Sequence, residues 1–193
     1  MAHEKQLRAF LAAEIPPNVK NSIRRIQEQL APLMQGIRWT KPEGIHLTLK
    51  FFGNISESDI PCISRAVERE AAVTVPVTLN AHSIGAFPGL SRPRVLWMGL
   101  EGDTDRLCKL HEAIDSDLQQ CGFQKDVRLF NPHLTLGRAK TQRGIYSGIR
   151  EIMAEKERYN AGQFEVSGIT LFRSDLKPDG PLYTKLAYYQ FNG

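Results

Sequence analysis

The sequence predicts an α+β fold of two similar lobes, with antiparallel sheets flanking a central cleft and helices outside. The main observation is a repeated tetrapeptide: His46-Leu47-Thr48-Leu49 returns as His133-Leu134-Thr135-Leu136, 87 positions later. Each copy lies midway through one half of the chain, which is typical of an internal duplication. Strand and helix signals alternate along both halves, and no long linker separates them. We therefore expect residues 1–193 to form a single domain of two packed lobes, related by an approximate two-fold axis.

The first half carries two strand–helix pairs. Proline suits the first turn of a helix, and Ser56 followed by Asp59 resembles a capping box. The expected elements are a strand over residues 7–15, a helix from Pro16-Pro17 to about residue 33, a strand over 46–53 and a helix over 57–72.

The second half repeats the alternation and ends in a hairpin. Gly122 is a stop signal for the helix that precedes the second repeat. The expected elements are strands over 75–84 and 94–100, a helix from Asp103 or Thr104 to Gly122, a strand over 133–138, a helix over 144–159, and strands over 163–172 and 182–191 around a turn at 177–181.

Composition gives only broad limits. The net charge of +4 and the pI of about 9.0 suit a polyanionic partner, but this signal is weak. Three cysteines at wide spacing argue against a disulfide framework or a zinc knuckle and favour a reducing compartment. The charged N-terminus has no signal-peptide pattern, and no stretch approaches the roughly 20 apolar residues needed to cross a bilayer. We expect a cytoplasmic protein without a membrane partner.

The repeated motif has the residue types needed for acid–base chemistry on a phosphate. In a strand, His and Thr of each copy share one face and the two leucines share the other. Two histidines can act as a general acid and a general base near neutrality, and threonine hydroxyls can stabilise phosphoryl charge. The other histidines have no such partner and are interpreted as structural. The predicted catalytic residues are His46 and His133, and the predicted substrate-binding residues are Thr48, Thr135 and Arg138.

No metal or cofactor is required, because these groups cover the proton transfers and the charge. Arg138 can add a bidentate contact to phosphate, since Gly137 lets the backbone depart from strict alternation. Lys50 shares the parity of His46, so its side chain could face the cleft, and the two orientations, toward the cleft and away from it, are equally expected. Four aromatic residues can stack on a nucleobase, although core packing is favoured for each. They are Trp39, Phe51, Phe87 and Phe130, and Phe51 has the parity of the leucines.

The two H-x-T motifs and their surroundings resemble the 2H phosphoesterase superfamily. Within it, the chain is similar to the bacterial and archaeal RNA 2',3'-cyclic phosphodiesterases, also called 2'-5' RNA ligases. The resemblance covers nearly the whole chain. Its segments are Arg8–Ala12, Trp39 with His46–Gly53, Gly85–Pro88 with Pro93–Trp97, Phe130–Arg138, and Leu171–Ser174 with Gly180–Tyr183.

The resemblance implies metal-independent opening of RNA or nucleotide 2',3'-cyclic phosphate ends to 2'-phosphomonoesters. It implies that His46 protonates the leaving 3' oxygen and that His133 activates water, although the residues alone do not say which histidine is the acid. In the reverse direction, a 5' hydroxyl would replace water and give a 2'-5' bond without ATP. A monomer is expected.

Three other interpretations stay open. The histidines could bind a metal, but neither has further ligand residues at close spacing. The chain could be a non-catalytic RNA-binding module, but it lacks RNP and KH signatures. It could act on another substrate of the superfamily, such as ADP-ribose cyclic phosphate or oligonucleotide 3' ends, because only the base pocket would differ.

Overall fold

The computed structural model describes residues 6–140, 148–178 and 180–193. The first half contains β1 (Gln6–Glu14), α1 (Pro17–Leu30), β2 (Ile37–Trp39), η1 (Pro42–Gly44), β3 (His46–Ser56), η2 (Glu57–Asp59), α2 (Ile60–Ala72) and β4 (Val77–Phe87). The second half contains β5 (Val95–Gly102), α3 (Thr104–Leu118), η3 (Gln119–Cys121), β6 (His133–Ala139), α4 (Ile149–Ala154), η4 (Lys156–Arg158), β7 (Asn160–Val166), β8 (Gly168–Lys177) and β9 (Gly180–Gln190).

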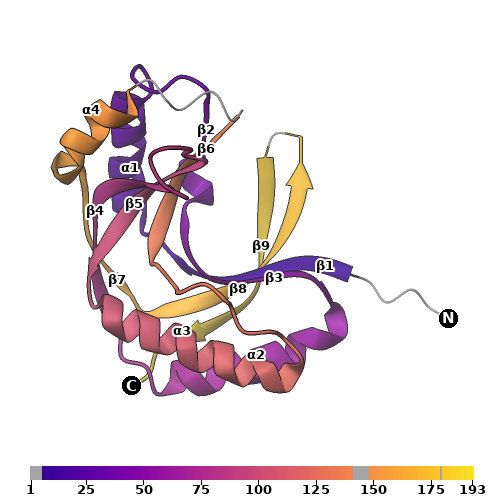
Figure 1. Ribbon diagram of the computed structural model, residues 1–193. Helices are drawn as coiled ribbons and strands as arrows, with labels where there is room; N and C mark the ends of the chain where they lie inside the picture. Colours follow the sequence, from indigo (N-terminus) through magenta and orange to yellow (C-terminus); the bar gives the residue numbers. More distant parts are fainter. Residues whose placement is uncertain (1–5, 141–147, 179) are drawn as a thin grey trace.

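The described strands form one nine-stranded antiparallel sheet in the order β7-β4-β5-β6-β3-β1-β8-β9, with β2 added beside β6 (Figure 1). The sheet has two groups of strands that meet at β6 and β3, where Leu134 and Leu47 form the paired residues. The predicted fold class is confirmed, and the two expected sheets prove to be joined into one at this contact.

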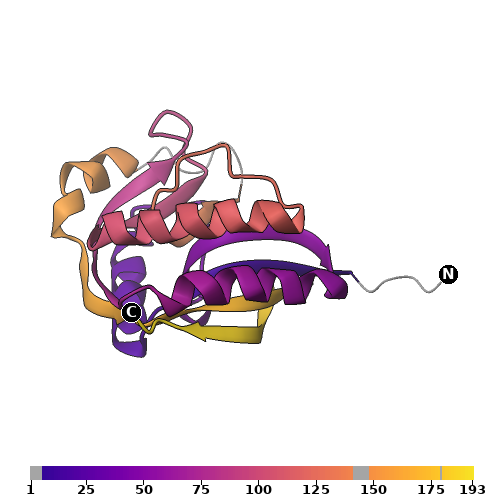
Figure 2. The same cartoon turned by 90° about the horizontal axis from the view of Figure 1, so that it is seen from below.

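The helices cover the face of the sheet that forms the main core. Val19, Ile23, Ile26 and Leu30 are buried on α1, as their helical spacing predicts. The helix α1 packs against β7, whereas α2 packs against α3 and β9, and Figure 2 shows α2 and α3 side by side. All four motif leucines point into this core, with at most 4% of each side chain exposed. The motif histidines and threonines therefore face the other side of the sheet.

Two β-bulges occupy equivalent positions in the two motifs. On β1, Leu11 and Ala12 pair with Lys50 and Thr48, so Leu49 is the extra residue of β3. On β5, Leu96 and Trp97 pair with Gly137 and Thr135, so Leu136 is the extra residue of β6. A bulge bends its strand and changes which face the following side chains occupy.

The first bulge decides between the two orientations left open for Lys50 and overturns the expectation for Phe51. Lys50 is 5% exposed and lies on the core side, so it does not face the cleft. Phe51 is 58% exposed, so its predicted core position is wrong. Beyond Leu49 the parity of β3 has reversed, which places Phe51 on the same face as His46.

The expectation of no disulfide is also wrong, because Cys62 and Cys121 are bonded and Cys108 is free. Cys62 lies in the first turn of α2, and Cys121 ends η3, directly after α3. The side-by-side packing of these helices brings Cα atoms that are 59 positions apart in sequence to 5.8 Å. Spacing along the chain does not reveal such a pairing, because it depends on how the helices pack.

Several element boundaries differ from the sequence expectation. The expected strand over residues 163–172 is two strands, β7 and β8, separated at Ser167. The expected helix over 144–159 is shorter: α4 and η4 cover part of it, and residues 144–147 lie outside the described part. The capping box of Ser56 and Asp59 and the β8–β9 hairpin are confirmed.

Within the described ranges, no helix combines the length and apolar character that crossing a membrane requires.

Candidate active site

The two H-x-T motifs lie on neighbouring antiparallel strands at the junction of the sheet. Leu47 pairs with Leu134. Continuing this antiparallel register places His46 opposite Thr135 and His133 opposite Thr48, so the two histidines are diagonal neighbours on one face. Residues at diagonal positions are about 7–8 Å apart, a separation at which two imidazoles can reach one phosphate. The predicted two-fold arrangement of the motifs is confirmed by this pairing.

His133 is oriented by the backbone just before its own strand. Its Nδ1 donates a hydrogen bond to the carbonyl oxygen of Asn131 at 2.7 Å, which leaves Nε2 available as an acceptor. The ring of Phe87 meets the imidazole edge-on at 5.0 Å, and Trp97 lies at 6.3 Å. Burial lowers the pKa of His133, the bond to Asn131 opposes this, and the charge of Arg138 lowers the pKa further. The neutral form that a general base needs is therefore favoured.

His46 is held in a more apolar setting. Phe10 stacks on the imidazole at 4.7 Å, and Tyr183 meets it edge-on at 5.3 Å. Burial lowers the pKa of His46 to about 4, against a hydrogen bond to the Gly44 backbone, and the charges of Lys20 and Arg138 add to the lowering. The Gly44 and Asn131 carbonyls each come two residues before their histidine, so both halves orient the ring by the same device.

The predicted phosphate-binding residues lie around this pair. Thr48 and Thr135 are partly buried, and neither hydroxyl makes a hydrogen bond to any residue that the structure describes. Arg138 is exposed and follows the bulge at Leu136 by two residues, which gives it the parity needed to face the site. Its charge lowers the pKa of both histidines. The structure thus brings the five predicted residues together.

A buried ionic cluster supports the loop that leads into the second motif. Lys50 forms ion pairs with Asp115 of α3 and with Asp126, and it also donates to the carbonyl oxygen of Gln124 at 3.0 Å. His111 of α3 stacks on Phe130 at 4.3 Å. These contacts fix residues 124–130 against β3 and α3, directly before Asn131. Sequence reasoning missed this role because the bulge hides the inward position of Lys50.

The aromatic residues divide between the core and the site. Trp39 and Phe130 pack against the core as predicted, whereas Phe87 contacts His133. Phe10 and Tyr183 line the site beside His46 and were not identified in advance. Phe10 had a weak signal: it alternates with Leu7, Ala9 and Leu11 and so belongs to the opposite face of β1.

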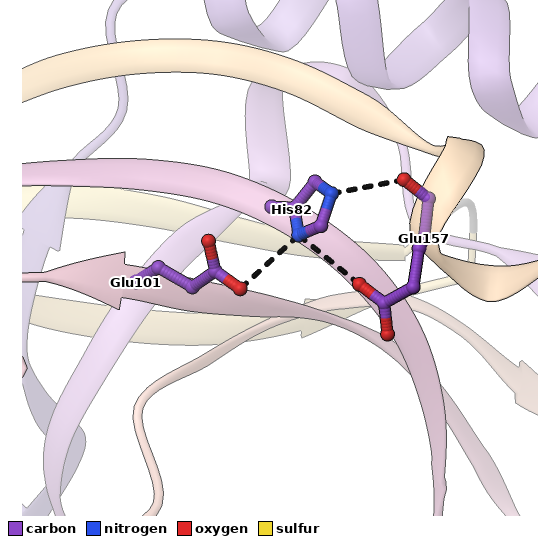
Figure 3. A group of neighbouring side chains, drawn as sticks. All are labelled: His82, Glu101 and Glu157. Atoms are coloured by element: carbon purple, nitrogen blue, oxygen red, sulfur yellow. Dashed lines mark hydrogen bonds and ion pairs between the residues drawn. The ribbon is translucent and has the colours of Figure 1, made fainter.

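A separate group of side chains could hold a metal ion. His82 lies between Glu101 and Glu157, with Nδ1 at 3.2 Å and 3.4 Å from their carboxylates (Figure 3). Its Nε2 contacts the Glu157 backbone carbonyl at 2.9 Å. These contacts tie η4 to β4 and β5. Neither motif histidine belongs to such a group among the described residues.

Two cavities differ in their relation to the motifs. A cavity of about 450 Å³ lies between α1 and α4 and is lined by neither motif histidine. A smaller one, of about 180 Å³, borders His46 and is also lined by Phe172 and Tyr183. The smaller cavity therefore extends the candidate site beyond the motifs.

Comparisons with known proteins agree with the duplication. The model of the family described as "LigT like Phosphoesterase" matches the chain twice, at residues 13–97 and 100–183. A protein of Methanothermobacter thermautotrophicus is 31% identical over 96% of this chain and 99% of its own length, and one of Methanocaldococcus jannaschii is 33% identical over 92% and 96%. Both are named RNA 2',3'-cyclic phosphodiesterase.

Solved structures share the fold. The Thermus thermophilus protein TT0787 is 27% identical, with a TM-score of 0.77, over 97% of this chain and 99% of its own. Escherichia coli LigT, crystallised with 3'-AMP, is 24% identical, with a TM-score of 0.79, over 98% of this chain and all of its own. The double family match, the near-complete coverage of these relatives and the paired H-x-T strands lead to one conclusion: the chain belongs to the LigT-like phosphoesterases of the 2H phosphoesterase superfamily.

Proposed function

We propose that this protein hydrolyses the 2',3'-cyclic phosphate ends of RNA to 2'-phosphomonoesters, with His46 and His133 as a metal-independent acid–base pair. The observation that carries the proposal is the antiparallel pairing of Leu47 with Leu134, which gives one sheet face a histidine and a threonine from each motif. The names of the archaeal relatives support the choice of substrate. Residues 1–193 would act as one domain of two lobes.

In the proposed reaction, His133 accepts a proton from water at Nε2 as the water attacks phosphorus. The bond between phosphorus and the 3' oxygen breaks, and His46 gives its proton to that oxygen. Thr48, Thr135 and Arg138 hold the phosphoryl oxygens, where preorganised donors stabilise the developing charge. If a 5' hydroxyl takes the place of water, the same ring opening breaks the bond to the 3' oxygen and forms a 2'-5' phosphodiester.

The lowered pKa of His46 fits the acid role once substrate is bound. A histidine with a pKa of about 4 is a strong proton donor when protonated, but few molecules carry the proton at neutral pH. The anionic phosphodiester stabilises the imidazolium, because an opposite charge nearby favours the charged form. Substrate binding therefore raises the protonated fraction where it is needed.

The test uses an oligoribonucleotide with a 2',3'-cyclic phosphate end, incubated with a strong chelator and without ATP. Phosphorus NMR should show a 2'-phosphomonoester as the product. His46→Ala and His133→Ala should each lose most of the activity, whereas His82→Ala, which removes a histidine of the Glu101–Glu157 group, should keep it. A 3'-phosphate product, or loss of activity in the chelator, would contradict the proposal.

The assignment of acid and base has its own test. A nitrophenyl phosphodiester has a leaving group that needs little protonation, so it should partly rescue His46→Ala and not His133→Ala. The opposite pattern would exchange the two roles.

RNA or nucleotide 2',3'-cyclic phosphate ends are the proposed partners, and the proposed state is a monomer in the cytoplasm. The Cys62–Cys121 disulfide argues against a cytoplasmic location, because disulfides persist mainly in oxidising compartments. Thiol counting on protein taken directly from cells would show whether the bond forms there.

A further inference from the structure

The cavity beside His46 is built from both charged and aromatic side chains. Lys20 of α1, Glu43 of η1 and Lys185 of β9 line it together with Glu14, whereas Phe172 and Tyr183 supply aromatic surface. Its volume is about 180 Å³. The lining contains two lysines and two glutamates, so the cavity has no net charge to attract a second phosphate. This composition fits a neutral, polar and flat group.

The direction of the proposed reaction decides which part of the substrate lies there, and this step rests on the proposed function. In an in-line displacement, the attacking and leaving oxygens lie on opposite sides of phosphorus. The 3' oxygen that leaves belongs to the ribose, and His46 protonates it. The terminal nucleoside therefore lies on the His46 side, where the cavity is, and the water lies on the His133 side.

Two of the four charged groups in the cavity are already paired. Lys185 forms an ion pair with Glu14 at 2.7 Å, and Glu14 also accepts a hydrogen bond from Thr170. The Lys20 ammonium makes a single 3.3 Å hydrogen bond, to the backbone carbonyl of Glu43, among the described residues. Within the same part of the chain, the Glu43 carboxylate has no hydrogen bond or ion pair. The Lys20 ammonium and the Glu43 carboxylate attract each other electrostatically, but no hydrogen bond joins them, so the ammonium keeps unused N–H donors beside an unused carboxylate acceptor.

We propose that this cavity binds the terminal nucleobase and prefers guanine. Guanine is the base whose Watson–Crick edge has two adjacent N–H donors, which can meet both oxygens of the Glu43 carboxylate. Its neighbouring O6 acceptor can meet the Lys20 ammonium, and lysine contacts to O6 are a common means of guanine recognition. Adenine, cytosine and uracil each put an acceptor beside their N–H donor, and this acceptor would face the carboxylate. Phe172 and Tyr183 provide aromatic surface against the base.

The experiment measures kcat/KM for the four nucleoside 2',3'-cyclic phosphates. The guanosine compound should be preferred over each of the others by about tenfold, the scale of one good bidentate base contact. Glu43→Gln replaces one acceptor by an amide donor, so the ratio of guanosine to uridine activity should fall by most of this factor. Glu28→Gln removes the same charge from the exposed face of α1 and should leave the ratio unchanged. Activity on the uridine compound reports whether each variant is folded.

The outcomes separate this inference from the proposed function. If none of the four compounds is hydrolysed, the proposed function fails. If all four are hydrolysed equally, or adenosine is preferred, the function stands and the guanine assignment is overturned. A guanosine preference that Glu43→Gln leaves intact would also overturn it, because the base would then bind elsewhere.

Discussion

The lowered pKa of His46 makes the stability of the fold depend on pH in a specific way. In the unfolded chain the imidazole has its ordinary pKa of 6.5, whereas burial against Phe10 and Tyr183 lowers the value in the fold to about 4. Between these values, the unfolded chain binds a proton that the folded protein does not. The contribution of His46 to stability is therefore complete above pH 6.5 and is lost as the pH falls toward 4.

The size of the effect follows from the two pKa values. The interval from 6.5 down to about 4 corresponds to a total of about 3 kcal/mol, since each tenfold change in protonation is about 1.4 kcal/mol. Most of this, about 2 kcal/mol, should be lost by pH 5, and almost none at pH 7. His133, whose pKa is also lowered, adds a further loss of the same sign.

The assay compares urea unfolding of the wild type and His46→Gln at pH 7 and pH 5. The wild type should lose about 2 kcal/mol more than the variant between these conditions, because glutamine does not titrate. The contribution of His133 is common to both proteins and cancels. Parallel losses in the wild type and His46→Gln would show that the fold does not lower the pKa of His46.

Four further outcomes are expected. The kcat/KM of the wild type should follow a bell-shaped curve against pH with its maximum below pH 6.5, because the pKa values of both histidines are lowered in the free protein. The kcat curve should lie at higher pH, because the bound anion favours the imidazolium form. Thr135→Ala should raise the barrier measured by kcat/KM by about 2–4 kcal/mol, and an unchanged value would show that its hydroxyl does not serve the transition state. Lys50→Met should cost about 3–5 kcal/mol in urea unfolding, because it leaves Asp115 buried without its partner, and Lys50→Met combined with Asp115→Leu should recover much of that loss. Cys62→Ser should lower the unfolding free energy by about 2–4 kcal/mol under non-reducing conditions, whereas Cys108→Ser should not.

The candidate site formed by the two H-x-T motifs could be predicted from sequence because it relies on local alternation and on repetition. Within each H-x-T the strand is regular, so the faces of His46, Thr48, His133 and Thr135 follow from parity alone. The repeat in matching contexts then places the two strands together. The same local reasoning predicted the Ser56 capping box, whose partners are three residues apart.

The rest depends on contacts between distant segments. The bulge at Leu49 arises from how β3 pairs with β1. It turns Lys50 toward the core, which alternation left open, and exposes Phe51, which alternation placed in the core. The disulfide requires α2 and α3 to pack side by side, which spacing does not reveal. The position of Phe10 beside His46 could not be predicted, because the apolar run of β1 is buried on both faces. Its hydrophobic pattern therefore does not distinguish the face toward the core from the face toward the cleft.

The matched bulges at Leu49 and Leu136 also show where the two halves have diverged. The residue two positions beyond each bulge is turned toward the site, and it is Phe51 in the first motif and Arg138 in the second. The duplication gives the two motifs the same backbone framework. A reaction that needs an acid in one motif and a base in the other therefore needs positions at which the two copies carry different side chains. A cation on one side and an aromatic ring on the other provide such a difference within a few residues of the proposed phosphate site. Exchanging Phe51 and Arg138 would test whether this single pair of positions determines which motif histidine acts as the acid and which acts as the base.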